Sequence, residues 1–543
     1  MNENTANPAP RGTAPDRTSV LIVGGSIVGV SAALFLAARG VTPILLEQHV
    51  GISPRLRAKL FYPRTMEAYR AVGAADDIYA IEHGRPRGEY AAVVESLAGA
   101  EIRRRRLPAA ADYSAVSPCQ GAMVKQGDAE RVLRMRASAE GADLRFGHRL
   151  VEWRQTGQGV AARVLDNRGV PYEIAADYLL AADGSASPVR EGLGIARSGD
   201  QALESCLELT FTADLGPLLE GRALALAFAD QPGRPFISWT TDQNAGAVSV
   251  GYDPATTDPE TVFTPKRCQA VVSAALGLPT SDFRITGARR WQMDAWVADT
   301  YRAERVFLLG DAAYVCPPVG GFGADTGIQD AWNIAAKLVS VLRGDAGARL
   351  LDHYEAERRP VAQLAVRQAV ARLAGAREQS MEDGEPLLSE AAVTLGYRYP
   401  GPGPCAEPLP PPADEPGRWH AEPGTRLPHV PLAEGTDLGS SSLDLVRGGR
   451  HALLTGRNGR SWQRAARSLD PGCAVLDAVV LTPQTLAPGA SFAESCGISE
   501  EGAVLVRPDG VVSWRSAHLV EAPSAALETA LRQAMANGRP DAR

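Results

Sequence analysis

The sequence predicts an α/β protein whose first domain contains a parallel sheet. Residues 19–23 are a short, continuous apolar run, as expected of a strand that is buried on both faces. A glycine turn and a run of good helix formers, 28–39, follow it, and residues 42–47 form a second strand. This β-α-β order implies parallel strands, because the helix returns the chain to the edge of the sheet where the first strand began.

The next segments predict further helices and a mainly antiparallel second domain. Residues 144–182 alternate and turn like a meander, and residues 204–253 are strand-like. A buried strand at 305–309 precedes the last helical patterns of this part of the chain. We expect helices at 64–80, 128–139, 325–342 and 349–377.

A proline-rich stretch separates the last part of the chain from the rest. Residues 400–431 contain eleven prolines, which is typical of a linker or of an extended segment that wraps a domain. Three apolar runs and a helical pattern at 523–535 follow, enough for a small α/β domain. We assign a disordered tail to 1–17, a first domain to 18–80, 120–190 and 285–385, a second domain to 81–119 and 191–284, a linker to 386–434, and a carboxyl-terminal domain to 435–543.

The composition excludes several classes of protein. Lys and Arg number 56 and Asp and Glu number 63, and the net charge of −7 argues against a nucleic-acid-binding protein. The seven cysteines form no C-x-x-C pair and no metal-ligand spacing, so we expect free thiols and no metal. Residues 19–38 carry no charge, but glycines interrupt them and a second strand follows. We therefore expect no membrane segment and a soluble, cytoplasmic protein.

The turn after the first strand carries the first chemical motif, Gly24-Gly25-Ser26-Ile27-Val28-Gly29. In a G-x-G-x-x-G turn that opens a helix, the glycines allow a tight turn and close approach of the backbone, and the helix N-terminus binds a diphosphate. Ser26 replaces the second glycine, but its small hydroxyl can itself donate to a phosphate. Glu47, followed by Gln48, ends the second strand, where an acid accepts from a ribose diol. The motif predicts a dinucleotide site, with a phosphate-free β-α-β turn as the alternative.

Two later strands also end in acidic turns. One delivers Asp183-Gly184, although an Asp-Gly pair is also common in ordinary turns. The other runs into Gly310-Asp311, where an acid at a strand end can accept from a ribityl hydroxyl. A loop then follows that would bring bare backbone toward a planar ligand and open a helix whose N-terminus stabilises negative charge. This loop contains Pro318 and the run Gly320-Gly321-Phe322-Gly323-Ala324-Asp325.

Together the three motifs resemble those of the class A FAD-dependent aromatic monooxygenases, the p-hydroxybenzoate hydroxylase-like group, with the bacterial aromatic polyketide hydroxylases as the most similar subgroup. The resemblance covers residues 18–385 and continues weakly beyond them. It implies a Rossmann-like FAD-binding domain, a mainly antiparallel β substrate domain and a thioredoxin-like carboxyl-terminal α/β domain. It also implies FAD as cofactor, NADPH or NADH and O2 as co-substrates, a small aromatic substrate, and a monomer or homodimer.

The resemblance implies a role for each matching residue. The FAD diphosphate and ribose would lie against Gly24, Gly25, Ser26, Val28, Gly29, Glu47 and Gln48. Arg57 would lie near the isoalloxazine, Arg64 would support that loop, and Gln126 would contact the ribityl chain. The remaining cofactor contacts would come from Asp183, Gly184, Gly310, Asp311, Pro318, Gly321, Phe322, Gly323, Ala324 and Asp325.

The catalytic candidates under this resemblance are Arg57, Tyr314 and Pro318. The candidate substrate contacts are aromatic, although buried aromatics more often belong to a core: Trp239, Tyr252, Trp291, Trp296 and Tyr314. The sequence also departs from the family pattern, which often has His at 314 and Asn at 325. A carboxylate at Asp325 would oppose a reduced flavin unless it caps a helix or faces away.

The implied reaction uses NAD(P)H and O2 to insert one oxygen atom into an aromatic polyketide or other polycyclic phenol, via a flavin C4a-hydroperoxide. Baeyer–Villiger oxidation or oxidative rearrangement of a polycyclic quinone is the alternative that the sequence does not separate. Trp291 and Trp296 do not match a halogenase signature, and the presence of Asp183 and Asp311 argues against a non-catalytic FAD-binding scaffold. In the carboxyl-terminal domain, Cys473 and Cys496 lack redox spacing, which favours a structural role.

Overall fold

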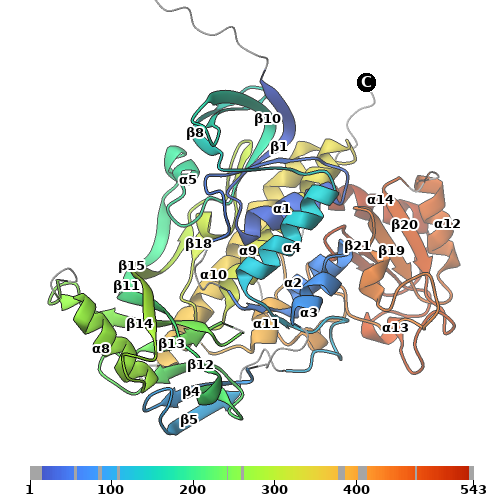
Figure 1. Cartoon of the computed structure of the whole chain (residues 1–543). Helices are drawn as coiled ribbons and strands as arrows, with labels where there is room; N and C mark the ends of the chain where they lie inside the picture. The colour runs from blue at the N-terminus through green and yellow to red at the C-terminus, as the bar shows by residue number, and fades with distance from the viewer. Residues whose placement is uncertain are drawn as a thin grey trace, which may run out of the picture.

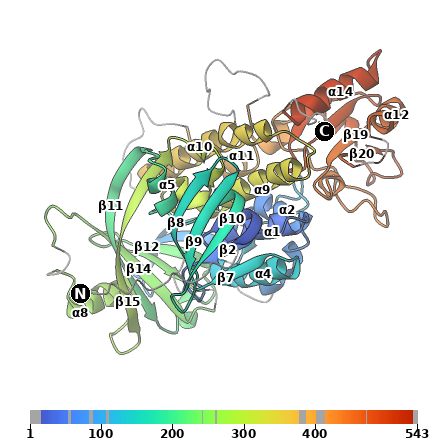
Figure 2. The same ribbon diagram turned by 90° about the horizontal axis from the view of Figure 1, so that it is seen from above.

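Three sheets organise the chain in the computed structural model, which describes residues 15–53, 58–82, 88–106, 111–240, 242–258, 262–376, 386–400, 413–470, 472 and 474–536. The second sheet and the carboxyl-terminal sheet lie on opposite sides of a central group of helices (Figures 1 and 2). In the described part of the chain, no helix is both long and apolar enough to cross a membrane.

The first sheet confirms the predicted parallel β-α-β unit. Its order is β16-β17-β10-β1-β2-β7, and the pairs β17–β10, β10–β1, β1–β2 and β2–β7 are all parallel. β8 and β9 extend it as an antiparallel meander. The strands are β1 (Asp16–Val23), β2 (Ile44–Glu47), β7 (Asp143–Phe146), β8 (Arg149–Thr156), β9 (Gly159–Leu165), β10 (Pro171–Ala181), β16 (Arg302–Ala303) and β17 (Val306–Leu308). β1 therefore begins inside the segment that we expected to be a tail.

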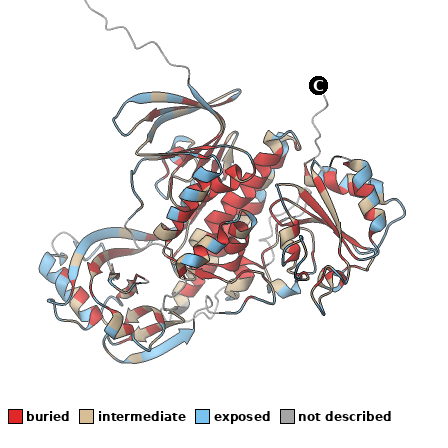
Figure 3. Ribbon diagram, turned by 45° about the vertical axis from the view of Figure 1, so that its right-hand side comes forward, coloured by how far each residue is buried: buried red, intermediate tan, exposed pale blue. Residues whose placement is uncertain are grey.

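Helices fill the centre of the molecule. α1 packs against both α4 and α9, and nearly all of its residues are buried, so the helices at the centre of Figure 3 are red. The expected helix at 64–80 is two helices, because the chain turns at Gly73, whose φ is +72°. The helices of this part are α1 (Ile27–Ala37), α2 (Pro63–Ala71), α3 (Ala75–Glu82), α4 (Gln126–Ala139), α5 (Pro188–Gly192), α9 (Phe322–Leu342) and α10 (Asp352–Ala376).

The second sheet has the order β18-β15-β11-β14-β13-β12-β4-β5 and is mainly antiparallel. β15 pairs with β11 along its length, so this sheet extends past residue 284, where we placed the domain boundary. One face is covered by α8 (Pro265–Leu276). The strands are β4 (Tyr90–Val94), β5 (Glu101–Arg106), β11 (Arg197–Thr212), β12 (Leu224–Ala229), β13 (Phe236–Trp239), β14 (Ala245–Tyr252), β15 (Arg284–Ala298) and β18 (Tyr314–Val315), with the short helix α6 (Gly216–Leu219).

The carboxyl-terminal sheet has the thioredoxin-like arrangement, with a parallel β-α-β unit followed by an antiparallel hairpin and a helix. Its elements are β19 (His451–Thr455), α12 (Arg460–Leu469), β20 (Leu476–Val480), α13 (Phe492–Ser495), β21 (Ala503–Val506), β22 (Val512–Ser516) and α14 (Pro523–Ala534). Part of the expected linker is folded onto this domain, because Leu427, Val430 and Leu432 belong to its core. α11 (Glu390–Thr394) lies in the same expected linker, whose residues 401–412 are outside the described part of the chain.

Candidate functional site

The turn between β1 and α1 has no room for side chains at its glycines. A Cβ at Gly24, whose φ is +106°, would lie 2.1 Å from the Ala182 carbonyl oxygen, and one at Gly29 would lie 1.9 Å from the Gly24 carbonyl oxygen. Ser26 is the N-cap of α1 and makes no capping bond with its side chain. The N-terminal amides of α1 are therefore left without a side-chain acceptor, as a diphosphate site requires.

Glu47 lies against this turn, where the sequence placed it. Its Oε2 accepts from the Gly25 N–H at 2.7 Å, and its Oε1 accepts from the His49 N–H at 2.8 Å. The neighbouring Gln48 is exposed. One carboxylate thus fixes the turn and remains at the rim of the site, within reach of a ribose diol.

Ser26 belongs to a three-residue network that joins α1 to α4. Its hydroxyl donates to Glu130 Oε1 at 2.8 Å, and Gln126 Nε2 donates to both Ser26 Oγ (2.9 Å) and Glu130 Oε1 (2.8 Å). Gln126 was predicted as a cofactor contact, and Glu130 was missed. The four-residue spacing of the two residues on one helix face is the signal that could have found Glu130.

Val28 closes the space between α1, α9 and the strand end at Gly310. A Cβ at Gly310 would lie 3.0 Å from Val28 Cγ2, and one at Gly327 would lie 2.7 Å from the same atom. The two glycines thus let the three segments meet around one side chain.

The Asp183-Gly184 turn follows β10 and contains a buried acceptor without a donor. Asp183 Oδ2 accepts from the Val189 N–H at 3.2 Å, whereas Oδ1 has no hydrogen-bond partner among the described residues. Burial raises the pKa of this carboxyl above its ordinary value. A buried acceptor that lacks a donor marks a place where a ligand hydroxyl or amide can bind.

The Gly310-Asp311 turn is held from behind by a buried ion pair. The Gly310 N–H donates to Asp330 Oδ2 at 3.2 Å, and Asp330 Oδ1 accepts from Arg358 Nε at 2.7 Å. Both side chains of the pair are fully buried, while Asp311 is exposed at the end of the strand. The pair was missed, because nothing local in the sequence relates Asp330 to Arg358.

Tyr314 supports the glycine-rich loop. Its ring is fully buried and its hydroxyl donates to the Gly323 carbonyl at 2.7 Å. Burial raises its pKa well above the ordinary value for tyrosine. Tyr314 was predicted as a catalytic and substrate residue, but its position is that of a loop support.

The loop itself joins Pro318 to the first turn of α9. Gly320 and Gly321 have φ values of +93° and +70°, and the Gly321 N–H donates to the Pro318 carbonyl at 3.1 Å. Pro318 is exposed, whereas the Phe322 ring is buried and stacks on Tyr62 with centroids 6.2 Å apart. Gly323 and Ala324 are half-buried in the first turn of the helix. The glycines of this loop are therefore partly accessible.

Asp325 fixes the start of α2. Its Oδ1 accepts from the Tyr62 N–H at 2.8 Å, and its Oδ2 has no partner within the described residues. Burial raises its pKa to about 7, although the neighbouring Thr65 hydroxyl and then the Tyr62 N–H lower the pKa. The carboxyl group can thus be protonated near neutral pH, which relieves the opposition to a reduced flavin.

The structure describes only one of the two predicted arginines. Arg57 lies outside the described residues. Arg64 is buried, and its guanidinium donates to Glu67 Oε2 at 3.2 Å and to the Asp509 carbonyl at 3.1 Å. Arg64, which was predicted to support the loop of Arg57, therefore contacts its own helix and the carboxyl-terminal domain.

The predicted substrate aromatics lie on different faces of the second sheet. Trp239 belongs to the core under α8, and Tyr252 packs on Phe263 beside that core with centroids 5.5 Å apart. Trp296 is fully buried between the guanidinium groups of Arg190 and Arg197. These three side chains do not share a site.

Trp291 is the exception. Its indole N–H donates to Ser249 Oγ at 3.3 Å, and Ser249 alternates with core residues of β14, so both point away from α8. Further along β15 the same face carries Ala295 and Val297, which belong to the core of the first sheet and its helices. The side of β15 that carries Trp291 therefore faces the first domain.

Two phenylalanines on this face were missed. Phe228 and Phe236 alternate with residues of the α8 core, and their rings are 5.2 Å apart. The alternation of small and large residues in β12 is the signal that could have found Phe228. We call the side chains of Phe228, Phe236, Ser249 and Trp291 the aromatic face.

A lysine joins the first domain to the second sheet. The Lys59 ammonium donates to the Trp239 carbonyl, and among the described residues no carboxylate lies within ion-pair distance of it. Lys125 is nearby and pairs with Asp242 at 3.6 Å. Burial, and then the charge of Lys125, lower the pKa of Lys59 to about 8. An uncompensated, half-buried cation favours the binding of an anion.

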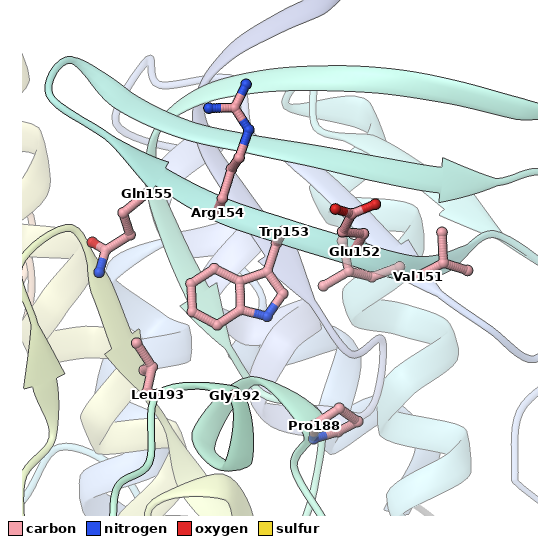
Figure 4. A pocket seen from close by; sticks show the side chains of 9 residues that line it. Val151, Glu152, Trp153, Arg154, Gln155, Pro188, Gly192 and Leu193 are labelled. Atoms are coloured by element: carbon pink, nitrogen blue, oxygen red, sulfur yellow. The ribbon is translucent and has the colours of Figure 1, made fainter.

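A shallow pocket of about 510 Å³ lies elsewhere, between β8 and α5. Figure 4 shows the Trp153 ring pointing toward Gly192 and Leu193 in this pocket. None of the predicted site residues lines it. It is therefore separate from the motifs that carry the chemistry.

The motif residues fit a FAD. Along the sheet, the exposed acid at Asp311 after β17, the side-chain-free turn at Gly24 after β1 and the acid at Glu47 in β2 match the ribityl, diphosphate and ribose groups in that order. One carboxylate oxygen each of Asp183 and Asp325 has no hydrogen-bond partner among the described residues and can accept from a ligand. No described group of three or more metal-ligating side chains could hold a metal ion.

Comparison with known proteins agrees with this reading. Residues 17–369 match the family described as FAD binding domain, and residues 420–540 match the aromatic-ring hydroxylase carboxyl-terminal family. The chain is 38% identical to a 4-methyl-5-nitrocatechol 5-monooxygenase of a Burkholderia species, over 96% of this chain and 98% of that protein. It is 36% identical to the tetracenomycin A2 monooxygenase-dioxygenase of Streptomyces glaucescens, over 96% and 97% respectively.

A solved structure resembles the whole chain. The crystal structure of aklavinone-11 hydroxylase with FAD and aklavinone superposes with a TM-score of 0.88 at 33% identity, over 96% of this chain and all of that one. The fold, the cofactor motifs and the relatives therefore agree. The chain belongs to the FAD-dependent aromatic-ring hydroxylases, monooxygenases that use FAD, a reduced nicotinamide and O2.

Proposed function

We propose that the protein inserts one oxygen atom from O2 into the ring of a polycyclic phenol, with an aromatic polyketide as the expected substrate class. The observation that carries this proposal is the aromatic face, whose Phe228, Phe236 and Trp291 lie on the side of the second sheet that is directed toward the FAD-binding domain. The relatives named for tetracenomycin and aklavinone support a polycyclic substrate.

When bound, FAD supplies the redox chemistry by accepting a hydride from NAD(P)H and activating O2. Gly24, Ser26 and Gly29 would hold its diphosphate at the N-terminus of α1, and Glu47 its ribose. Gln126, Asp183 and Asp311 would bind the ribityl chain and its surroundings, and the backbone of Gly321–Asp325 would line the ring system. Arg57 is proposed near the ring system on the family resemblance alone.

At the substrate, the chain's task is to hold an electron-rich ring and exclude water. Trp291, Phe228 and Phe236 provide an apolar surface for stacking, and Ser249 provides a polar group on the same face. We assign to Lys59 the stabilisation of the ionised phenol oxygen, because it is half-buried and its ammonium faces no described carboxylate. Tyr314 acts indirectly, through the loop that it supports.

An alternative outcome on the same scaffold is Baeyer–Villiger or rearrangement chemistry on a quinone. The relative named as a monooxygenase-dioxygenase is the observation that keeps it open. Turnover under ¹⁸O2, followed by mass spectrometry of the product, separates the outcomes. One labelled atom on an intact ring supports hydroxylation, one labelled atom in a lactone supports Baeyer–Villiger oxidation, and two labelled atoms support dioxygenation.

We also propose the domain ranges and the oligomeric state. We assign 18–80, 120–190 and 285–385 to FAD binding and 81–119 and 191–284 to substrate binding, with β15 shared between them. We also propose a monomer or homodimer in the cytoplasm, with no nucleic-acid or membrane partner.

The first test follows the flavin. Purified protein should show the visible absorption of bound flavin, and anaerobic reduction by NADPH should accelerate when a polycyclic phenol is added. Asp311→Ala should loosen FAD by about tenfold or more, because it removes a charged acceptor from a bound hydroxyl. Full flavin content in that variant would contradict the role of Asp311, and phenol-independent reduction would contradict the substrate proposal.

A further inference from the structure

The turn between β21 and β22 inserts into the helices that carry the flavin loop. Asp509 lies in this turn and is 3% exposed, and the Trp332 indole N–H donates to its backbone carbonyl at 2.9 Å. Arg64 donates to the same carbonyl at 3.1 Å. One backbone oxygen of the carboxyl-terminal domain thus accepts from both α9 and α2.

Buried charges lock this turn in place. Arg507 Nη2 lies 2.9 Å from Glu357 Oε2 of α10 and 2.5 Å from Asp509 Oδ2. Lys337 Nζ of α9 lies 2.7 Å from the same Glu357 oxygen. Asn333 Nδ2 donates to Glu357 and to Asp509, at 2.8 Å and 3.2 Å. Two cations and two carboxylates are therefore paired within the interface, and the buried charges balance.

A chain of direct contacts leads from this turn to the flavin loop. Arg64 lies in the first turn of α2, two residues after Tyr62. The Tyr62 N–H donates to Asp325 at 2.8 Å, and its hydroxyl donates to the Gly320 carbonyl at 2.7 Å. Gln329 of α9 donates to the Arg64 carbonyl at 3.1 Å. The start of α2 is thus held between the carboxyl-terminal turn and the loop at Gly320.

We propose that the Arg507–Gly510 turn positions α2 and α9, so that the carboxyl-terminal domain sets the affinity for FAD, with Arg64 as the positioning residue. The inference rests on the proposed place of FAD at the loop from Pro318 to Asp325. It gives the appended domain a function without thiol chemistry, since its described cysteine, Cys496, is buried and burial raises its thiol pKa.

The test is Arg64→Met, compared with Arg70→Met as a matched control. Both arginines lie on α2 and both contact the carboxyl-terminal region, but Arg70 pairs with Asp444 at the rim, where its side chain is 34% exposed. We expect Arg64→Met to raise the Kd for FAD by tenfold or more, with a changed visible flavin spectrum, and Arg70→Met to change it by less than threefold. Arg64→Lys, which keeps one donor, should recover part of the affinity.

FAD affinity is measured by titrating apoprotein in the absence of NADPH and phenol, so a wrong substrate proposal does not affect the result. If Arg64→Met does not fold, Trp332→Phe removes the second donor to the Asp509 carbonyl while keeping an aromatic ring. Wild-type FAD affinity in Arg64→Met, or in Trp332→Phe should the former not fold, would overturn the proposal. Equal losses in Arg64→Met and Arg70→Met would also overturn it, because they would indicate general undocking of the domain.

Discussion

The segment from Lys59 to Glu67 has a charged side chain at each end, half-buried at Lys59 and buried at Glu67, and the two ends differ in how that charge is compensated. Lys59 contacts the second sheet through one backbone carbonyl, beside a second lysine and without a described carboxylate partner. Arg64 and Glu67 contact the carboxyl-terminal domain through a network in which Glu67 accepts from Arg64, Arg426 and Ser117.

The difference separates two uses of a charged side chain. A compensated pair fixes one arrangement of the chain, and its cost of desolvation is already offset within the protein. A charge that has no partner within the protein can pair with an oppositely charged group of a ligand when that ligand binds. The same segment therefore connects the fixed interface at Glu67 to Lys59, whose charge is available to the substrate.

The largest expected effect comes from removing the charge of Glu67, which compensates Arg64 and Arg426. Burial alone would raise the pKa of Glu67, but Arg426 and Arg64 lower it below its ordinary value. Glu67→Gln would leave two buried arginines without their carboxylate and should lower the free energy of unfolding by about 3 kcal/mol or more. Urea unfolding of the apoprotein measures this loss.

The control for that change is Asp444→Asn, which removes the rim partner of Arg70. Because this pair is partly exposed, the loss should stay below about 1 kcal/mol. Similar losses in the two variants would contradict the distinction between buried and rim charges.

Removing the uncompensated charge should act on ligand binding rather than on stability. The low pKa of Lys59 means that the folded state resists its protonation, so stability rises with pH between about 8 and 10.5. Lys59→Met should lack this rise and lose little stability at neutral pH. It should raise the pKa of a bound hydroxyanthraquinone by about one unit, equal to about tenfold weaker phenolate binding.

The bound phenol reports directly on this effect, because its colour changes on ionisation. Lys125→Met is the comparison, since Lys125 already pairs with Asp242. A bound phenol whose pKa is the same in Lys59→Met and wild type would exclude the assigned role.

A pH-dependent effect concerns Asp325, which holds Tyr62 between the two ends. Its pKa is raised from 3.8 to about 7, so the folded state binds the extra proton and stability falls as pH rises through this interval. Asp325→Asn keeps an acceptor for the Tyr62 N–H. It should gain stability relative to wild type between those pH values, by at most roughly 1.4 kcal/mol for each unit of pKa displacement, and the gain should level off above pH 7.

Unfolding curves collected across this pH range supply the measurement. A stability difference between Asp325→Asn and wild type that does not vary with pH would show that Asp325 keeps an ordinary pKa.

The sequence predicted what local chemistry determines. The strand, turn and helix at 19–39 and the acid at Glu47 are confirmed in position, because glycine conformation and strand ends are local properties. The partner of Arg64 is 445 residues away and no local pattern relates them. The faces of Trp239 and Trp291 were also not predictable, because each depends on how its strand is placed in the sheet.

Val28 has a consequence for the placement of the cofactor. Wedged between Gly310 and Gly327, it fixes the separation of the turn that opens α1 from the loop that opens α9. The two turns therefore lie at one fixed distance from each other. A flavin nucleotide bound with its phosphate at the α1 turn and its ring system at the α9 loop would span this distance, and the adenosine half that distinguishes FAD would lie beyond the α1 turn, at Glu47.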